Sequence, residues 1–187
     1  MTDSAYLSIT EALRRHYVSN NLPTDGDCEN KRWALLSLGR VEVRVKNFDW
    51  RRRALMRHDL HHLITGYPCT AAGEFQIATW EFAAGRFPNV LSTLFCLPLV
   101  GVGAVAIPRR SFRSYVLGRR SRTLYAIYSD DELLASNVTE LRLRCLPSIP
   151  PSATVVDIIT YIALVALSMS LIALPILPLL LLYLQHR

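Results

Sequence analysis

The chain has 187 residues, enough for one domain of ordinary size, and 51% of them are hydrophobic, which is high for a soluble domain. Its net charge of +6 suits an anionic partner such as nucleic acid, a lipid surface or an acidic ligand. Because the apolar residues concentrate in 87–108 and 153–184 and no nucleic-acid-binding motif occurs, we expect a membrane surface and no nucleic acid.

The N-terminal third predicts one helix and one small hairpin. Ser8 and Glu11 have the spacing of a capping box, so a helix is expected from there to about Ser19. The alternating stretch "VEVRV", with "WALLSL" before it, predicts a small β-hairpin near 33–46. The four cysteines include no CxxC pair, which argues against a zinc ribbon and predicts reduced thiols: Cys28, Cys69, Cys96 and Cys145.

Two helices joined by a tight turn are expected next. Asp49 is placed to cap a helix through Thr65, which Gly66 and Pro68 then end. Thr70 is placed to cap a second helix, over 71–85, whose apolar residues recur at helical spacing.

The segment 87–108 has no charged side chain and is long enough to suggest a membrane span. Pro98 and the Gly-Val-Gly sequence at 101–103 are expected to break it into shorter pieces. We therefore expect a buried segment, or one that lines a lipid-binding groove over 89–107, in preference to a second transmembrane helix.

Six arginines follow between Arg109 and Arg122, and two interpretations remain open for them. One is a solvated basic loop. The other is a surface that binds lipid phosphates or an anionic group, with Arg109, Arg110 and Arg113 as its candidate residues.

The C-terminal part predicts a helix, a linker and a membrane anchor. Ser129 and Glu132 form a second capping box, which opens a helix expected to continue through Leu141. Residues 147–153 are rich in proline and predict a linker between a domain over 1–146 and an anchor over 154–184. The fold class is thus mainly α, with the small hairpin and a C-terminal transmembrane helix.

The anchor contains 27 consecutive uncharged residues, 158–184. As a helix they would measure about 40 Å, which exceeds a hydrocarbon layer of about 30 Å and allows tilt or a kink at Pro175 and Pro178. Almost all Lys and Arg residues precede this stretch, so the positive-inside rule predicts a single-pass anchor with the main domain in the cytoplasm.

A candidate metal site lies in "RHDLHHLITGYPCTAAGE". His58 and His62 are four residues apart and share one face of the expected helix, with Asp59 at the edge of that face. Glu74 follows on the next helix, which an antiparallel turn would bring back beside the first. Two nitrogen and two carboxylate donors suit zinc, iron, manganese or cobalt better than calcium. The alternative is an ordinary histidine-rich helix surface.

Comparison of this pattern with known motifs favours one family. The His-Asp-x-x-His sequence differs from the HExxH of zinc proteases, and the spacing suits the HD phosphohydrolases poorly. The pattern His58-Asp59-x-x-His62, eleven residues, then Glu74, with "HHLITGYP", "GE" and "WEF" around it, resembles the signature of the Coq-four family of coenzyme Q (ubiquinone) biosynthesis proteins. The close resemblance covers about Arg51 to Gly85.

The resemblance implies a mainly helical, membrane-associated, lipid-binding metalloprotein. It implies a divalent metal, with zinc favoured, held by His58, Asp59, His62 and Glu74. It further implies a lyase-type reaction that removes the C1 carboxylate from a polyprenylated hydroxybenzoate-derived ring, with an oxidative form of this step as an alternative, and contact with other quinone-biosynthesis enzymes. The anchor and the weak match after Gly85 are departures from the family pattern.

Other interpretations and one further residue remain open. The chain could be a non-enzymatic, lipid-binding scaffold for quinone-biosynthesis enzymes, or a membrane-bound metal-dependent hydrolase. His61 is a candidate for a role behind the metal ligands or in proton transfer. The simpler expectation for it is a histidine on the helix surface.

Overall fold

The structure is a computed structural model that describes residues 7–22, 33–38, 41–46, 49–85, 87, 90–125 and 129–185. Within these residues the chain is mainly helical, as predicted, with one two-stranded hairpin. The strands are β1 (Trp33–Leu38) and β2 (Val41–Lys46), and the helices are α1 (Ile9–Ser19), α2 (Asp49–Thr65), α3 (Ala71–Ala84), α4 (Val90–Ala106), α5 (Pro108–Gly118), α6 (Asp130–Ala135), α7 (Val138–Cys145) and α8 (Val155–Gln185).

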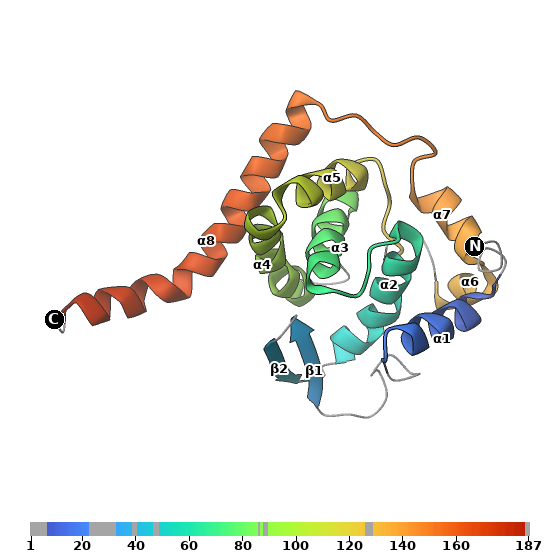
Figure 1. Ribbon diagram of the computed structural model, residues 1–187, viewed down its shortest axis with the longest axis horizontal. Coiled ribbons are helices and arrows are strands. Elements are labelled where there is room, and N and C mark those ends of the chain that lie inside the picture. Colours follow the sequence, from blue (N-terminus) through green and yellow to red (C-terminus); the bar gives the residue numbers. More distant parts are fainter. Residues whose placement is uncertain are drawn as a thin grey trace.

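Helix α3 packs against α2, α4 and α5. In Figure 1, α3, α4 and α5 lie at the centre, with α8 along one side and α2, α1, α6 and α7 on the other. The hydrophobic core lies mainly between α3 and this second group, where the largest side chains are fully buried: Ile9, Leu60, Ile64, Ile77, Trp80, Leu124, Leu133 and Leu141. Burial of these apolar side chains is the main source of the fold's stability.

Several local predictions are confirmed. Ser8 caps α1, where its hydroxyl accepts a hydrogen bond from the Glu11 N–H at 3.3 Å. The hairpin pairs Trp33 with Lys46 and Leu38 with Val41 in antiparallel register. The described cysteines, Cys69, Cys96 and Cys145, are free thiols, and Cys28 lies outside the described residues.

Four features fix the turn between α2 and α3. Gly66 has φ +76°, in the left-handed region that favours glycine at a helix end. Thr70 caps α3 as predicted, since its hydroxyl accepts from the Gly73 N–H at 3.3 Å. A Cβ on Gly73 would collide with the backbone carbonyl of Pro68, so only glycine fits before Glu74. Arg142 of α7 donates to the Leu63 and Ile64 carbonyls and so caps the end of α2.

One prediction for the middle of the chain is wrong, and two that left alternatives open are narrowed. Pro98 and the glycines do not interrupt α4, which runs for 17 residues. Only one face of α4 is buried, including Ser92, Leu97 and Val100, so the segment is not a fully buried one. The arginines from Arg109 to Arg113 lie on the helix α5 and not in a loop.

The helix predicted from Ser129 to Leu141 is interrupted. The Ser129–Glu132 capping box is present, but α6 ends at Ala135 and Asn137 caps a new helix, α7. Ser136 between them has extended backbone, with ψ 175°. The Asn137 side chain accepts from the Glu140 N–H at 2.9 Å, so a local side-chain cap competes with continuation of the first helix.

Residues 147–153 contain no helix or strand, and α8 follows them. The stretch Val155–Leu174 is long and apolar enough to cross a membrane, and most of it is exposed. Figure 1 shows α8 bending toward the C-terminus, in the region of the chain that contains Pro175 and Pro178.

Candidate metal centre

Three predicted metal ligands meet at one point. His58 and His62 extend from one face of α2, and Glu74 extends toward them from the first turn of α3. The two Nε2 atoms are 3.3 Å apart, and each lies 3.3 Å from an oxygen of the Glu74 carboxylate. The helix–turn–helix arrangement therefore brings together donors from both sides of the turn, and the cluster can hold a metal ion.

The outer nitrogen of each imidazole has its own hydrogen-bond acceptor. His62 Nδ1 lies 2.9 Å from the Tyr67 carbonyl oxygen, and His58 Nδ1 lies 3.3 Å from Glu81 Oε1. Since a carbonyl or a carboxylate oxygen accepts only, both Nδ1 atoms are assigned as donors. Both Nε2 atoms face Glu74, and once an ion displaces the proton held there they present lone pairs to it, which is the orientation that metal-ligating histidines need.

The spacing of the donors fits a tetrahedral ion. Bonds of about 2.0–2.1 Å at tetrahedral angles place neighbouring donor atoms about 3.3–3.4 Å apart. The three separations in the cluster are each 3.3 Å. Two histidines and one glutamate also leave a fourth position open, which is typical of catalytic rather than structural zinc sites.

The electrostatics of the metal-free cluster favour a cation between these groups. Burial alone would lower the pKa of His58, but the carboxylates of Glu81 and Glu74 outweigh it and raise that pKa well above its usual value. Burial would likewise raise the pKa of Glu74, but hydrogen bonds with His58 and His62 hold it well below its usual range. A proton on His58 thus occupies the position that a metal ion would take.

Glu81 is a functional candidate that the sequence analysis missed. It is fully buried, and its Oε1 accepts from His58 Nδ1, from His61 Nδ1 at 2.6 Å and from the Tyr125 hydroxyl at 3.0 Å. Burial would raise its pKa, but the charge of His58 and these hydrogen bonds lower it to about 2. Its position seven residues after Glu74 puts it on the same face of α3, which is the signal that could have revealed it.

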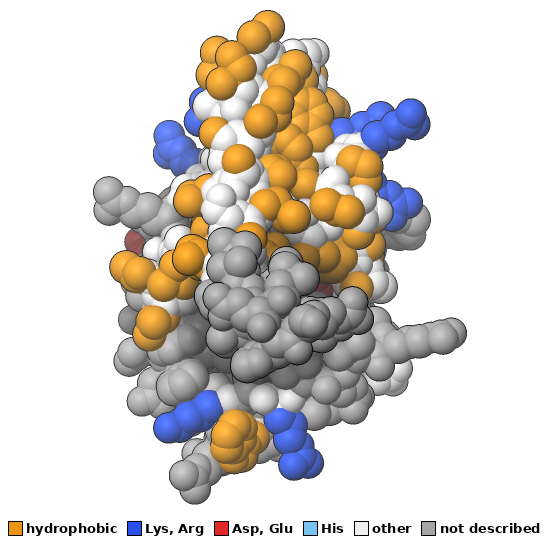
Figure 2. Space-filling view, turned by 90° about the vertical axis from the view of Figure 1, so that its left-hand side faces the viewer, with side chains coloured by type: hydrophobic (Ala, Val, Ile, Leu, Met, Phe, Trp, Pro, Cys, Tyr) orange, Lys and Arg blue, Asp and Glu red, His pale blue; other side chains and the backbone are white. Residues whose placement is uncertain are grey.

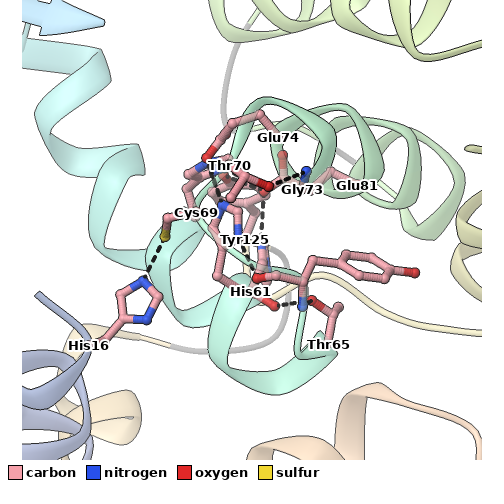
Figure 3. Close-up of polar contacts among 12 residues, drawn as sticks. His16, His61, Thr65, Cys69, Thr70, Gly73, Glu74, Glu81 and Tyr125 are labelled. Atoms are coloured by element: carbon pink, nitrogen blue, oxygen red, sulfur yellow. Dashed lines mark hydrogen bonds and ion pairs between the residues drawn. The ribbon is translucent and has the colours of Figure 1, made fainter. Parts of the chain in front are cut away.

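His61 is buried and not on the helix surface, so the simpler expectation for it is wrong. Its side chain is 0% exposed, and burial lowers its pKa. As a neutral imidazole it donates from Nδ1 to Glu81 and accepts at Nε2 from the Leu124 N–H at 2.9 Å. Figure 3 shows His61, Tyr125 and Glu81 in this arrangement. His61 thereby orients Glu81, which in turn orients His58.

Glu81→Gln is expected to weaken metal binding by about 10- to 100-fold, the usual effect of changing a residue that orders a metal ligand. The amide keeps the shape but removes the negative charge that makes His58 a better donor. Affinity is measured by competition with a chromophoric chelator, and Glu140→Gln on α7 is the control. Unchanged affinity in the folded Glu81→Gln protein would show that Glu81 does not support the centre.

Asp59 is not a member of the three-residue cluster. Its side chain is buried, and its Oδ2 accepts from the Tyr17 hydroxyl of α1 at 2.9 Å. It is nevertheless close enough for the charges of His58, His62 and Glu74 to affect it. Burial raises its pKa to about 6. Its role as a ligand remains a prediction from the sequence, and the structure provides a second role, in joining α1 to α2.

Asp59→Asn tests both roles. A carboxyl whose pKa is raised in the folded state stabilises the protein below its unfolded pKa of 3.8, and loses that effect as the pH rises through about 6. The metal-free variant is therefore expected to be more stable than the wild type at pH 7.5, by up to about 3 kcal/mol, but not at pH 4. Urea unfolding at both pH values measures this. An equal gain at both would contradict the assignment, and loss of bound metal would support ligation by Asp59.

A second polar pair borders the cluster. The Cys69 thiol lies 3.1 Å from His16 Nε2 (Figure 3). The His16 ring stacks on the ring of His62, with a centroid distance of 6.2 Å. Burial raises the pKa of Cys69 to about 11 and lowers that of His16. The thiol therefore keeps its proton and donates to a neutral imidazole, which makes Cys69 a poor metal ligand beside the cluster.

The predicted arginine site is separate from the metal centre. Arg109, Arg110 and Arg113 are exposed on α5, whereas the metal donors lie on α2 and α3. Binding of an anionic group by these arginines remains a prediction.

No known protein family matches the chain, and no curated protein or solved structure matches it. The case for a metal centre accordingly depends on the geometry and electrostatics of these residues.

Proposed function

We propose that this chain is a membrane-anchored zinc protein of the Coq-four type, acting on a polyprenylated, hydroxybenzoate-derived ring in ubiquinone biosynthesis. The observation that carries the proposal is the convergence of His58 Nε2, His62 Nε2 and the Glu74 carboxylate, with both Nδ1 atoms already engaged. The spacing of the same residues in the sequence is what resembles the Coq-four signature.

Zinc is the proposed ion because two imidazoles and one carboxylate at tetrahedral spacing suit it, with iron, manganese and cobalt as alternatives. A bound divalent ion would supply Lewis-acid stabilisation of a carboxylate or phenolate. The protein's own residues hold the site in shape. Glu81 fixes the ring of His58, the Tyr67 carbonyl fixes that of His62, and His61 and Tyr125 hold Glu81.

The proposed reaction is a decarboxylation. The bond between ring carbon C1 and its carboxylate breaks, carbon dioxide leaves, and a proton takes its place on C1. The atoms balance with one proton from the protein or solvent and need no oxidant. A site with an open position beside buried, preorganised hydrogen bonds suits charge that develops during such a step.

The membrane part of the proposal is supported by α8. A polyprenylated substrate partitions into the bilayer, so an enzyme that acts on it gains from anchoring there. The stretch Val155–Leu174 is apolar enough to cross a membrane, and the excess of Lys and Arg before it favours a cytoplasmic main domain.

The test is elemental analysis and lipid mass spectrometry on the full chain purified in mild detergent, followed by an assay with a prenylated hydroxybenzoate. We expect about one zinc ion per chain, a co-purified quinone precursor, and carbon dioxide release that requires metal. An unrelated lipid, or conversion by the metal-free protein, would contradict the proposal.

Two other functions have distinct outcomes in the same experiment. A scaffold for quinone-biosynthesis enzymes would retain metal and lipid but release no carbon dioxide. A hydrolase is favoured by one observation, since two histidines, one glutamate and an open position also occur in hydrolytic zinc sites. It would cleave an ester or amide substrate and leave the hydroxybenzoate ring intact.

A further inference from the structure

The N-terminal half of α8 packs closely against α4. The Ser168 hydroxyl donates to the Leu97 carbonyl at 2.6 Å and accepts from the Gly101 N–H at 2.8 Å. In a regular helix that N–H would bond to that carbonyl, so the Ser168 side chain is inserted into the hydrogen-bond ladder of α4. A Cβ on Gly101 would lie 2.6 Å from Ser168 Oγ, so glycine allows this approach. Small residues at such contacts are typical of helices that pair in membranes.

This contact fixes the depth of α4 relative to α8. Ser168 comes 13 residues after Val155 (168 − 155), or about 20 Å along the helix. The apolar stretch of 20 residues is about 30 Å long, the thickness of a hydrocarbon layer. If α8 crosses a membrane over this stretch, Ser168 lies within the hydrocarbon, and so do Leu97 and Gly101 of α4.

The outer face of α4 has the side chains that such a position requires. Among the described residues of α4 none is charged, and Val90 and Val105 are each 72% exposed, with Leu91, Leu94 and Val102 also exposed. The neighbouring α8 exposes apolar side chains too, among them Ile159, Ile162, Leu167 and Leu174. Figure 2 shows hydrophobic side chains gathered over the upper part of this side of the molecule, with Lys and Arg near its margins.

Charged groups at the ends of this surface match a bilayer rather than a protein partner. Arg109, Arg110 and Arg113 are exposed directly after the end of α4, where their long side chains can extend toward lipid phosphates. Asp157, an acidic residue in the first turn of α8, is 1% exposed and forms a bidentate pair with Arg120 at 2.6 and 2.7 Å. Pairing of this kind is how acidic groups are tolerated near a membrane.

We propose that α4 and α8 form one membrane-embedded surface, with α4 entering the hydrocarbon layer beside α8. The proposal rests on membrane anchoring through α8, as in the proposed function. The proposed surface lies one helix away from the metal donors of α3, because α4 also packs on α3, the helix that carries Glu74 and Glu81. At this contact a Cβ on Gly103 would lie 2.9 Å from the Cβ of Phe75, the residue after Glu74.

The test is tryptophan quenching in the full chain, reconstituted in phosphatidylcholine–phosphatidylglycerol vesicles that contain lipids brominated at mid-chain. A tryptophan is introduced at Leu94→Trp on α4, at Ile162→Trp on α8, or at Leu143→Trp on α7, where the wild-type side chain is 73% exposed. The three native tryptophans give a background common to all variants. We expect the added fluorescence at 94 and 162 to be largely lost, and that at 143 to be retained.

The outcomes separate the two proposals. Quenching at 162 with none at 94 would overturn the two-helix surface and leave α8 as the anchor. Absence of quenching at both positions would overturn membrane anchoring itself. Equal quenching at all three would also contradict the proposal, because α7 would then lie in the lipid together with α4 and α8.

Discussion

Glu74→Gln is expected to give a folded protein that has lost its metal, with affinity reduced more than about 100-fold. The substitution keeps the size of the side chain but removes the carboxylate that both Nε2 atoms face at 3.3 Å. The Glu74 side chain is 26% exposed, so water can replace part of its lost contacts with the two imidazoles. The free energy of unfolding should therefore fall by about 1–2 kcal/mol. Metal content after dialysis and thermal unfolding measure the two effects.

The matched control is Glu140→Gln. Glu140 is also a helical, partly exposed glutamate, and it pairs with Arg144 at 2.8 Å on α7. It should keep the full metal content and nearly the full stability. Retention of metal by Glu74→Gln at the wild-type level would show that the cluster is not the binding site.

Metal affinity is expected to fall about tenfold for each unit of pH below neutrality, as one proton competes for the site. The pKa of His58 is raised well above its usual value because Glu81 and Glu74 outweigh its burial, so the metal-free site is protonated at pH 7. The ion must displace this proton from Nε2. Calorimetry in buffers of different ionisation enthalpy should find about one proton released per ion at pH 7.

The same titration on a Glu81 variant tests whether Glu81 raises the pKa of His58. In Glu81→Gln the pKa of His58 should fall, because one of the two carboxylates that raise it is gone. Both proton release at neutral pH and the pH dependence of affinity should then decrease. Affinity that is constant between pH 6 and pH 8 in the wild type would contradict the assignment of a raised pKa to His58.

Spacing and turn residues predict the three donors that meet, as part of an expected set of four with Asp59, while the family resemblance is what favours that set over a histidine-rich helix surface. The four-residue spacing of His58 and His62, and a turn marked by Gly66, Pro68 and Thr70, determine which faces of two helices meet. These features are local, and local sequence encodes them well.

The network behind the ligands depends on tertiary packing and was not predicted. Whether His61 is exposed or buried is decided by the segment at Leu124, which lies 63 residues away in the chain. The same holds for Tyr17, whose hydroxyl reaches Asp59 across 42 residues. The spacing of residues within one helix cannot predict contacts with such distant segments.

The sequence alone does not predict the length of α4, because the effect of a proline or a glycine on a helix depends on the residues that pack against it. Pro98 removes a backbone donor, but the helix continues, and at Gly101 the missing side chain makes room for Ser168 of α8. A residue that weakens an isolated helix can thus be the one that permits its packing. At Ser136 the error was the reverse, since the competing cap at Asn137 ended a helix that the apolar pattern would have continued.

The central claim is that His58, His62 and Glu74 hold one ion with an open position. X-ray absorption at the zinc edge of the loaded full-length protein tests it most directly. We expect only nitrogen and oxygen neighbours at about 2.0–2.1 Å, with the multiple scattering of two imidazoles and a total coordination of about four. A sulfur neighbour at about 2.3 Å, or scattering from more or fewer than two imidazoles, would contradict the site.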